Sequence, residues 1–215
     1  MSDSPRRDHW SRVYEEKAPE TVSWYQAAPE PSLRALARFG ATPTASLIDV
    51  GGGASTLVDA LLAQDWEDIT VVDIAAPALE AARARIGPRA DEVRWVVADI
   101  TDWHTDRAYE VWHDRAVFHF LTEPGQREAY RRALSSGLAA GGLAIFATFA
   151  LDGPERCSGL EVEQYDAEKL ASELGPLLTL IGSWKEVHVT PWGSSQSFNW
   201  CVFRRSDQSD RLVDE

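Results

Sequence analysis

The residues best suited to chemistry are two carboxylates, Asp49 and Asp73, and the three consecutive glycines 51–53. An apolar, β-prone run at 47–50 leads into the glycines, and apolar residues at helical spacing follow at 57–62. Glycine is needed where the backbone turns sharply or a ligand approaches it, because glycine has no Cβ to clash. Amides at the start of the following helix suit a polar or negative ligand. The pattern predicts a strand, a glycine turn and a helix; a tight turn without any ligand is the alternative.

The helix after the glycines is expected to begin near Thr56, because Thr56 and Asp59 have the spacing of a capping box. A second β-branched run, 69–72, ends in Asp73, which lies 20 residues beyond Gly53. An acid at the tip of the second strand of a βαβ unit can accept hydrogen bonds from both hydroxyls of a ribose. The dinucleotide fingerprint requires glycine at 56, where this chain has Thr56. The pattern therefore favours a nucleoside without a diphosphate over NAD.

Three segments, IDVGGG at 48–53, VVDI at 71–74 and VVADI at 96–100, resemble successive motifs of the class I S-adenosylmethionine-dependent methyltransferases. The family's glycine motif, D/E-x-G-x-G-x-G, is matched by Asp49, Gly51 and Gly53, whereas Ser55 replaces its last glycine. The resemblance covers roughly residues 10–204. It implies S-adenosylmethionine as the cofactor and S-adenosylhomocysteine as the product.

The order of the expected elements predicts an α/β fold. Strands and helices alternate from 47 to 149, which favours a parallel sheet. Two final strands, at 181–189 and 197–204, are joined by a short turn and must be antiparallel. The resembled fold has the same end, so we expect a Rossmann-like, doubly wound, mostly parallel seven-stranded sheet with a C-terminal antiparallel hairpin.

The resemblance also implies which residues bind the cofactor. The methionine end is expected at Asp49, Gly51, Gly52 and Gly53, the ribose at Asp73 and Ile74, the adenine at Asp99 and Ile100, with His113 nearby and Tyr14 and Trp24 as a lid. Two of these expectations have plain alternatives. For Asp99 the alternative is a helix or turn cap, and for the aromatic N-terminal segment it is a helix that packs on the core.

The fourth expected strand ends in His113, Asp114 and Arg115, where the resembled family has its fourth motif between cofactor and acceptor. Ligands bind outside the carboxyl ends of such strands. We therefore take His119 and Asp114 as candidate catalytic residues. The alternatives are a structural ion pair of Asp114 with Arg115 and a core position for His119.

The acceptor side is expected to use the loop at 152–165, which should overhang the site, and the C-terminal hairpin. The candidates are Arg156, Cys157, Tyr165, His188, Gln196 and Trp200. Arg156 suits an acceptor carboxylate, although a surface position is the alternative. Cys157 suits a small buried position equally well. Alternate residues of a terminal strand face opposite sides, so the sequence alone does not assign the side of His188 or Gln196.

Composition bounds the remaining possibilities. A chain of 215 residues suits one domain, expected over 1–205 with 1–31 as a lid segment and 206–215 as a disordered tail. The net charge of −13 and the absence of a basic stripe disfavour nucleic acid and anionic membranes as partners. The five histidines show no metal-binding spacing, so we expect no metal. Without a signal-peptide pattern or a long apolar run, we expect a cytoplasmic monomer or homodimer.

Short loops and the lack of a docking domain favour a small-molecule methyl acceptor. A protein lysine methyltransferase is the first alternative, because the resemblance extends to lysine-methylating enzymes of this fold. A cofactor-binding interaction protein that has lost catalysis is the second.

Overall fold

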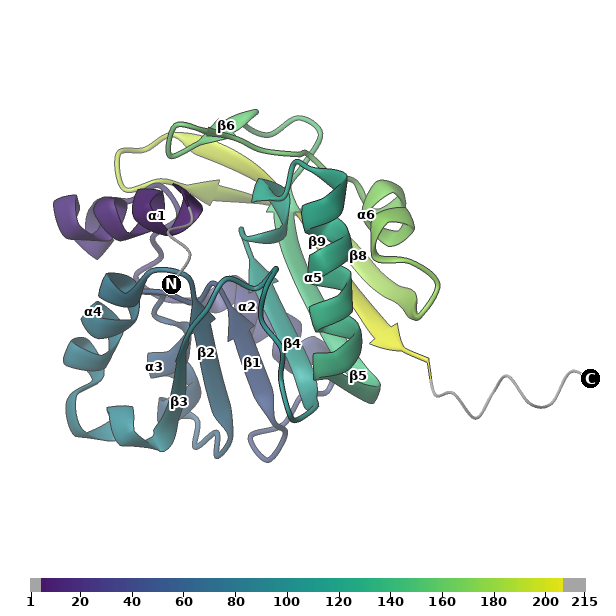
Figure 1. The fold of residues 1–215 in the computed structure, drawn as a ribbon, viewed down its shortest axis with the longest axis horizontal. Coiled ribbons are helices and arrows are strands. Elements are labelled where there is room, and N and C mark those ends of the chain that lie inside the picture. Colours follow the sequence, from purple (N-terminus) through teal and green to yellow (C-terminus); the bar gives the residue numbers. More distant parts are fainter. Residues whose placement is uncertain (1–4, 207–215) are drawn as a thin grey trace, which may run out of the picture.

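The computed structural model of the chain describes residues 5–206, which form a twisted seven-stranded sheet covered by helices on both faces (Figure 1). The strands lie in the order β3-β2-β1-β4-β5-β9-β8. Their bounds are β1 Leu47–Val50, β2 Ile69–Asp73, β3 Val93–Val97, β4 Tyr109–Arg115, β5 Leu138–Phe149, β8 Leu178–Val189 and β9 Ser195–Arg205. Strands β1 to β5 pair in parallel, and β9 pairs antiparallel with both β5 and β8. The predicted mostly parallel sheet with a C-terminal antiparallel hairpin is confirmed.

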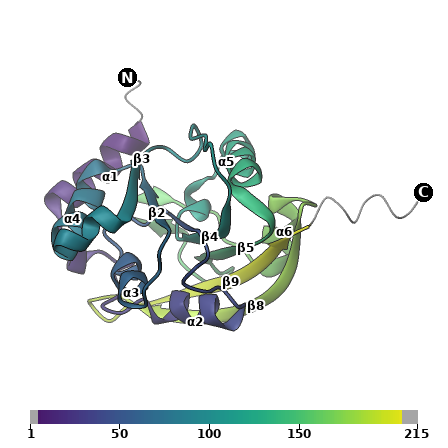
Figure 2. The same ribbon diagram turned by 90° about the horizontal axis from the view of Figure 1, so that it is seen from below.

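Helices on the two faces bury two separate cores (Figure 2). The helices are α1 Pro5–Glu16, α2 Glu30–Arg38, α3 Leu57–Ala63, α4 Ala76–Ile86, α5 Pro124–Gly137 and α6 Ala167–Leu174, with 3-10 turns η1 Pro19–Thr21, η2 Gly87–Glu92 and η3 Phe118–Phe120. Helices α2, α3 and α4 pack on one face through residues such as Leu36, Leu61 and Leu79. Helices α5 and α6 cover the other face through Leu134 and Leu170. No helix among residues 5–206 has the length and apolarity that a membrane crossing requires.

The parallel register brings the chemistry-bearing residues to one edge of the sheet. Asp49 of β1 lies opposite His113 of β4, and Asp73 of β2 lies opposite Val97 of β3. Helix α1 lies beside α4 at this carboxyl edge (Figure 1). The N-terminal segment therefore lies at the same edge as the strand tips.

Two local predictions were wrong. The expected capping box at Thr56 does not form, because the Thr56 hydroxyl donates to the carbonyl of Gln26 at 3.0 Å and makes no cap. The Ser55 hydroxyl instead accepts from the Leu57 amide at 3.1 Å.

The stretch 152–165, which was expected to be a loop, is not wholly irregular. Its strands β6 Arg156–Cys157 and β7 Leu160–Glu161 form a small antiparallel sheet. The tail expected at 206–215 lies outside the described residues apart from Ser206.

The turn after β1 depends on glycine at each of its three positions. Gly51 and Gly53 have φ of +66° and +43°, which L side chains rarely adopt. An ideal Cβ would lie 2.0 Å from Cγ2 of Val117 at Gly51, 2.5 Å from Oδ2 of Asp49 at Gly52, and 2.8 Å from Oδ2 of Asp73 at Gly53. The turn thus packs bare backbone directly against the two carboxylates.

A buried polar network fixes β4 to α5. The Tyr130 hydroxyl donates to Oδ2 of Asp114 at 2.6 Å and accepts from Nε1 of Trp112 at 2.8 Å. The other oxygen of Asp114 accepts from the amides of Val117 and Phe118 at 3.0 and 3.2 Å. Asp114 is therefore fully engaged in holding the turn that follows β4.

Replacing Tyr130→Phe should lower the free energy of unfolding by about 2–3 kcal/mol, because it leaves a buried carboxylate and a buried indole N–H short of a partner. Tyr109→Phe is the matched control, since the Tyr109 hydroxyl is buried without a hydrogen-bond partner. Its removal should change stability by less than about 0.5 kcal/mol or increase it. Urea denaturation measures both variants. Equal losses in the two variants would contradict the network.

Replacing Gly51→Ala should destabilise the chain by about 1–3 kcal/mol more than Gly40→Ala. Both positions have positive φ, +66° and +79°, but a Cβ at Gly40 meets nothing within 4 Å. The control therefore carries the backbone strain alone, and the difference reports the overlap with Val117. Denaturation of Gly51→Ala with and without Val117→Ala should show partial recovery in the double variant. Identical stability of the two alanine variants would show that the turn relaxes freely.

Candidate functional site

The carboxyl edge of the sheet contains one site with two adjoining compartments. The polar compartment is lined by Ser32, Asp49, Gly51, Gly52, Ser55, Thr56, His113 and Arg115, together with residues of the segment after α1. The aromatic compartment is lined by Trp10, Tyr14, Trp24, Phe120, Phe149, Cys157 and Phe198, and by Gly51, Asp73, Ile74, Asp99, Ile100 and Arg115 on its strand side. The aromatic compartment has about 880 Å³ free of protein atoms, a value that includes open solvent at its mouth. A concave, mostly apolar site with a few polar groups suits a small-molecule ligand.

Asp49 begins a buried hydrogen-bonded chain in the polar compartment. Nδ1 of His113 lies 2.7 Å from Oδ1 of Asp49, and Nε2 lies 3.0 Å from the Ser32 hydroxyl. In the neutral imidazole, Nδ1–H donates to the carboxylate and the Ser32 hydroxyl donates to Nε2. Strand β4 and helix α2 therefore orient the Asp49 carboxylate, whose second oxygen lies beside the glycine turn.

Asp73 ends β2 at the wall of the aromatic compartment. Its Oδ1 accepts from the Ala75 amide at 2.8 Å, and the site of a Cβ on Gly53 lies between Oδ2 and the Tyr14 hydroxyl. Burial raises the pKa of Asp73 to about 7; the Asp49 charge adds to this, while the Ala75 amide opposes it. Such a carboxyl changes charge close to neutral pH and suits hydrogen bonding with uncharged hydroxyls.

Asp99 caps a turn, which is the alternative that the sequence left open, and also lies at the cavity wall. Its Oδ1 accepts from the amide and hydroxyl of Thr101 at 3.0 and 2.7 Å, which caps the turn after β3. Its Oδ2 forms an ion pair with Arg6 of α1 at 2.8 Å, at the cavity wall beside Ile100. Sequence reasoning missed Arg6, because nothing in the order of residues connects the first helix with the third strand.

Aromatic side chains of the N-terminal segment cover the site. The Trp24 indole N–H donates to the Tyr14 hydroxyl at 3.1 Å. The Trp10 ring meets the rings of Trp24 and Phe120 edge-on, with centroids 5.6 and 5.0 Å apart. The structure thus places the two predicted lid residues, Tyr14 and Trp24, at the cavity. Trp10 joins them.

The two candidate catalytic side chains do not line either compartment. Asp114 is fully buried on the α5 side of the sheet, where Tyr130 and two amides occupy it. The Nδ1 atom of His119 accepts from the Phe149 amide at 3.1 Å, and its ring packs on Phe149 and Phe198. Burial, and next the charge of Arg115, lowers the pKa of His119 to about 3, so its ring is neutral.

The acceptor candidates divide between the site and other places. Cys157 lines the aromatic compartment, with its Sγ 3.7 Å from the Ser23 hydroxyl. His188 lies 2.7 Å through Nε2 from the carbonyl of Ser23 and so holds the segment after α1. Trp200 stacks on Trp184 in the core, close to His113.

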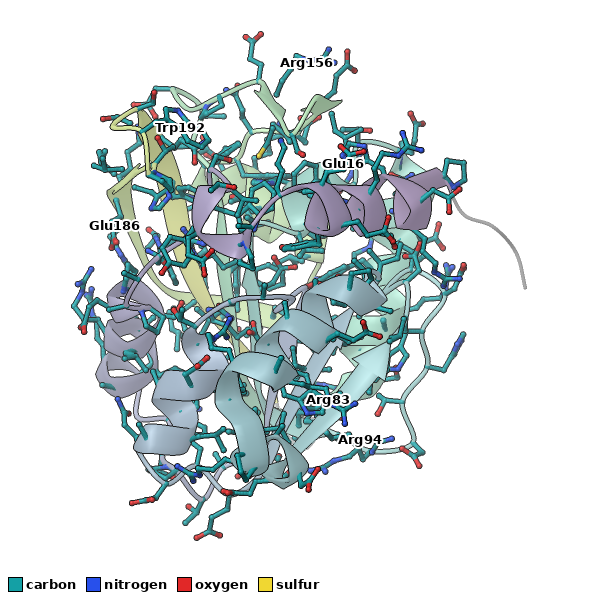
Figure 3. All side chains as sticks on the ribbon, turned by 90° about the vertical axis from the view of Figure 1, so that its left-hand side faces the viewer. Glu16, Arg83, Arg94, Arg156, Glu186 and Trp192 are labelled. Atoms are coloured by element: carbon teal, nitrogen blue, oxygen red, sulfur yellow. The ribbon has the colours of Figure 1, made fainter. Side chains whose placement is uncertain are left out.

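Three other candidates lie away from the site. Arg156 is exposed on the β6–β7 hairpin, pairs with Glu161 and donates to the carbonyl of Gly159 (Figure 3). Tyr165 is fully buried against Phe118 on the α5 side. Gln196 is buried on β9 and lines neither compartment. Arg156 therefore lies at the surface, which was the alternative to a role in binding the acceptor.

Arg115 lines the site, although sequence reasoning did not propose it as a site residue. The alternative of an ion pair with Asp114 is not observed, because alternate side chains of β4 point to opposite faces of the sheet. The guanidinium instead lines both compartments and donates through Nη1 to the carbonyl of Trp24 at 2.9 Å. The sequence did offer one signal for this role: Arg115 is the last residue of β4, and ligands bind at the carboxyl ends of such strands.

Comparison with known proteins agrees with this architecture. Residues 47–142 match a family described as a methyltransferase domain. No curated protein gives a significant match. A methyltransferase from Anabaena variabilis has a TM-score of 0.75 at 16% identity, covering 94% of this chain and 96% of its own. The N-methyltransferase NodS from Bradyrhizobium japonicum has a TM-score of 0.72 at 17% identity, covering 93% and 100%.

A third similar structure is the 1,6-didemethyltoxoflavin-N1-methyltransferase of Burkholderia thailandensis, with a TM-score of 0.71 at 18% identity and coverage of 96% and 92%. At these identities the likeness establishes the fold. The family match spans β1 to β5, which carry the glycine turn and the acidic strand tips. Residues 47–142 thus match a methyltransferase domain, and the match, the motifs and the fold together support a class I S-adenosylmethionine-dependent methyltransferase.

Proposed function

We propose that this methyltransferase acts on a small-molecule acceptor held in the aromatic compartment. The observation that carries the proposal is that the glycine turn, Asp73 and Asp99 line one cavity with the aromatic side chains. Cofactor and acceptor thereby have adjoining places at the same sheet edge. Two similar structures agree in kind: NodS was solved with S-adenosylhomocysteine, and the Burkholderia enzyme with S-adenosylhomocysteine and 1,6-didemethyltoxoflavin.

The residues present fit the cofactor. Gly51, Asp73 and Asp99 line the aromatic compartment, and Asp49, Gly52 and His113 line the adjoining polar compartment. Asp73 would accept the ribose hydroxyls, with Ile74 beside them, and Asp99 and Ile100 would contact the adenine. Asp49, Gly51, Gly52 and His113 would surround the methionine end, and Tyr14 and Trp24 would close over the cofactor. In this proposal residues 1–205 form one domain with 1–31 as its lid.

The chemistry asks more for alignment than for a base. When bound, S-adenosylmethionine supplies an electrophilic methyl group, which an acceptor lone pair attacks while the sulfur keeps the electrons of the breaking C–S bond. The aromatic walls exclude water and hold the acceptor in line. His119 is a poor base because Nδ1 already accepts a hydrogen bond and Nε2 holds the proton of the neutral ring. We therefore assign His119 and Asp114 positioning roles in this proposal.

Incubating the purified protein with methyl-labelled S-adenosylmethionine and a cell extract tests the proposed function. Mass spectrometry should find the label in the small-molecule fraction and not in protein. The Asp73→Asn variant is the control for background transfer. Label confined to a protein would instead establish a protein methyltransferase, and no label despite tight cofactor binding would indicate an inactive binding protein.

Binding of S-adenosylhomocysteine should strengthen as the pH rises. A carboxylate accepts ribose hydroxyls better than a carboxylic acid does, and Asp73 has a pKa of about 7. Below a pH of about 7, the dissociation constant should therefore increase roughly tenfold for each pH unit by which the pH is lowered. It should become independent of pH at about pH 8. Asp73→Asn should lose about 1.5–3 kcal/mol of binding at pH 8 and most of the pH dependence.

Calorimetric titration between about pH 5 and pH 8 measures the pH dependence of binding and its loss in Asp73→Asn. This range extends about one pH unit or more to either side of the pKa of Asp73. Asp106→Asn is the matched control, because Asp106 is 85% exposed in its side chain and lies outside both compartments. It should behave as the unaltered protein. A pH dependence that survives in Asp73→Asn would assign the titration to another group and remove Asp73 from the ribose.

A further inference from the structure

Arg115 places a cation without a carboxylate partner at the centre of the site. Its half-buried guanidinium faces both compartments, and its Cζ lies 5.2 Å from the centroid of the Phe198 ring. Its Nη1 donates a hydrogen bond to the carbonyl of Trp24. Among the described residues, Arg115 takes part in no ion pair, although a half-buried cation in an apolar wall is costly to leave unpaired.

The acids whose charges reach Arg115 are already engaged elsewhere. Glu186 and Asp49 are the two that raise its pKa, against a larger lowering by burial that brings it to about 10. Glu186 pairs with Arg34 at 2.9 Å, and Figure 3 shows it toward the outer side of the β8 edge. Asp49 accepts from His113 at 2.7 Å. Nη1 is thus the one guanidinium nitrogen with a hydrogen-bond partner among residues 5–206, in a side chain that lines both compartments.

The side chains around Arg115 indicate what kind of ligand fits beside its guanidinium. Trp10, Phe120, Phe149 and Phe198 give the aromatic compartment flat apolar walls. Flat walls suit a planar ring, which gains from stacked or edge-on contact. Because Asp99 and Ile100, the proposed adenine contacts, line the same compartment, its walls have to accommodate the adenine as well as the acceptor ring. The planar fork of an arginine matches a carboxylate with two parallel hydrogen bonds.

We propose that Arg115 binds a carboxylate of the methyl acceptor, so that the acceptor is an aromatic carboxylic acid. This inference rests on the proposed function, since it concerns the acceptor half of the same site. The role foreseen for Arg156 passes to Arg115, because Arg156 is exposed and paired with Glu161. Arg115 acts here as a binding residue and takes no part in the transfer of the methyl group.

The carboxylate of the cofactor itself is the competing source of the same chemistry. The polar compartment offers that group the Ser55 and Thr56 side chains and the backbone at the start of α3. Phe198, over which the Arg115 guanidinium lies, lines the aromatic compartment and not the polar one. These positions favour the acceptor, and the experiment separates the two sources.

Titration of the S-adenosylhomocysteine-loaded protein with phenylacetate and indole-3-acetate, each beside its carboxamide, tests the proposal. The acids should bind at least about tenfold more tightly than the amides, because only the acids pair with the guanidinium. Arg115→Gln should abolish that preference and leave the affinity for S-adenosylhomocysteine within about twofold. Arg115→Lys should keep part of the preference, and Arg156→Gln, the matched control, all of it.

Three results would overturn the inference. One is equal binding, or no binding, of acids and amides by the loaded protein. Another is a loss of S-adenosylhomocysteine affinity in both Arg115→Gln and Arg115→Lys while circular dichroism shows folded protein, which would assign Arg115 to the cofactor. A third is retention of the acid preference in Arg115→Gln. Failure of the unaltered protein to bind S-adenosylhomocysteine would instead refute the proposed function, so the two failures are distinguishable.

Discussion

Close packing of a glycine turn against Val117, Asp49 and Asp73 is the constraint on which the rest of the site depends. A Cβ at any of the three glycines would approach one of these side chains to less than 3 Å. Because the turn is bare backbone, the carboxyl ends of β1, β2 and β4 converge on one cavity. The register between Asp49 and His113 then fixes the polar end of that cavity. Side chains added here would separate the groups that have to act together.

The site carries charges of both signs although the whole chain has a net charge of −13. Asp49 and Asp73 are both buried, and the charge of Asp49 adds to the effect of burial in raising the pKa of Asp73. His113 relieves Asp49 by a hydrogen bond, whereas Asp73 relies on backbone amides. Arg115 brings a positive charge between the compartments, and Arg6 neutralises Asp99. The acids therefore suit hydroxyls and a positive group, and Arg115, which lines both compartments, suits an anion.

Local patterns predicted most of the fold and the strand-tip half of the site. The strands at 47–50 and 69–73 and their terminal acids are visible because each depends on neighbours in the sequence. Arg6 and Phe198 were missed, because only tertiary packing brings them to the site. Asp114 and Arg115 show a second limit: β4 was predicted, but side-chain direction along it decides which residue meets the cavity. Tyr165 lies in the stretch that follows β5, which was expected to overhang the site, but its ring packs against Phe118 on the α5 side of the sheet.

The central claim is that the glycine turn and the carboxylate of Asp73 bind the two ends of one sulfonium nucleoside. A crystal structure of the complex with S-adenosylhomocysteine tests it most directly. We predict both ribose hydroxyls within hydrogen-bonding distance of Asp73, the adenine beside Asp99 and Ile100, and the homocysteine end against Gly51 and Asp49. A nucleoside bound elsewhere, or one whose ribose faces away from Asp73, would contradict the account.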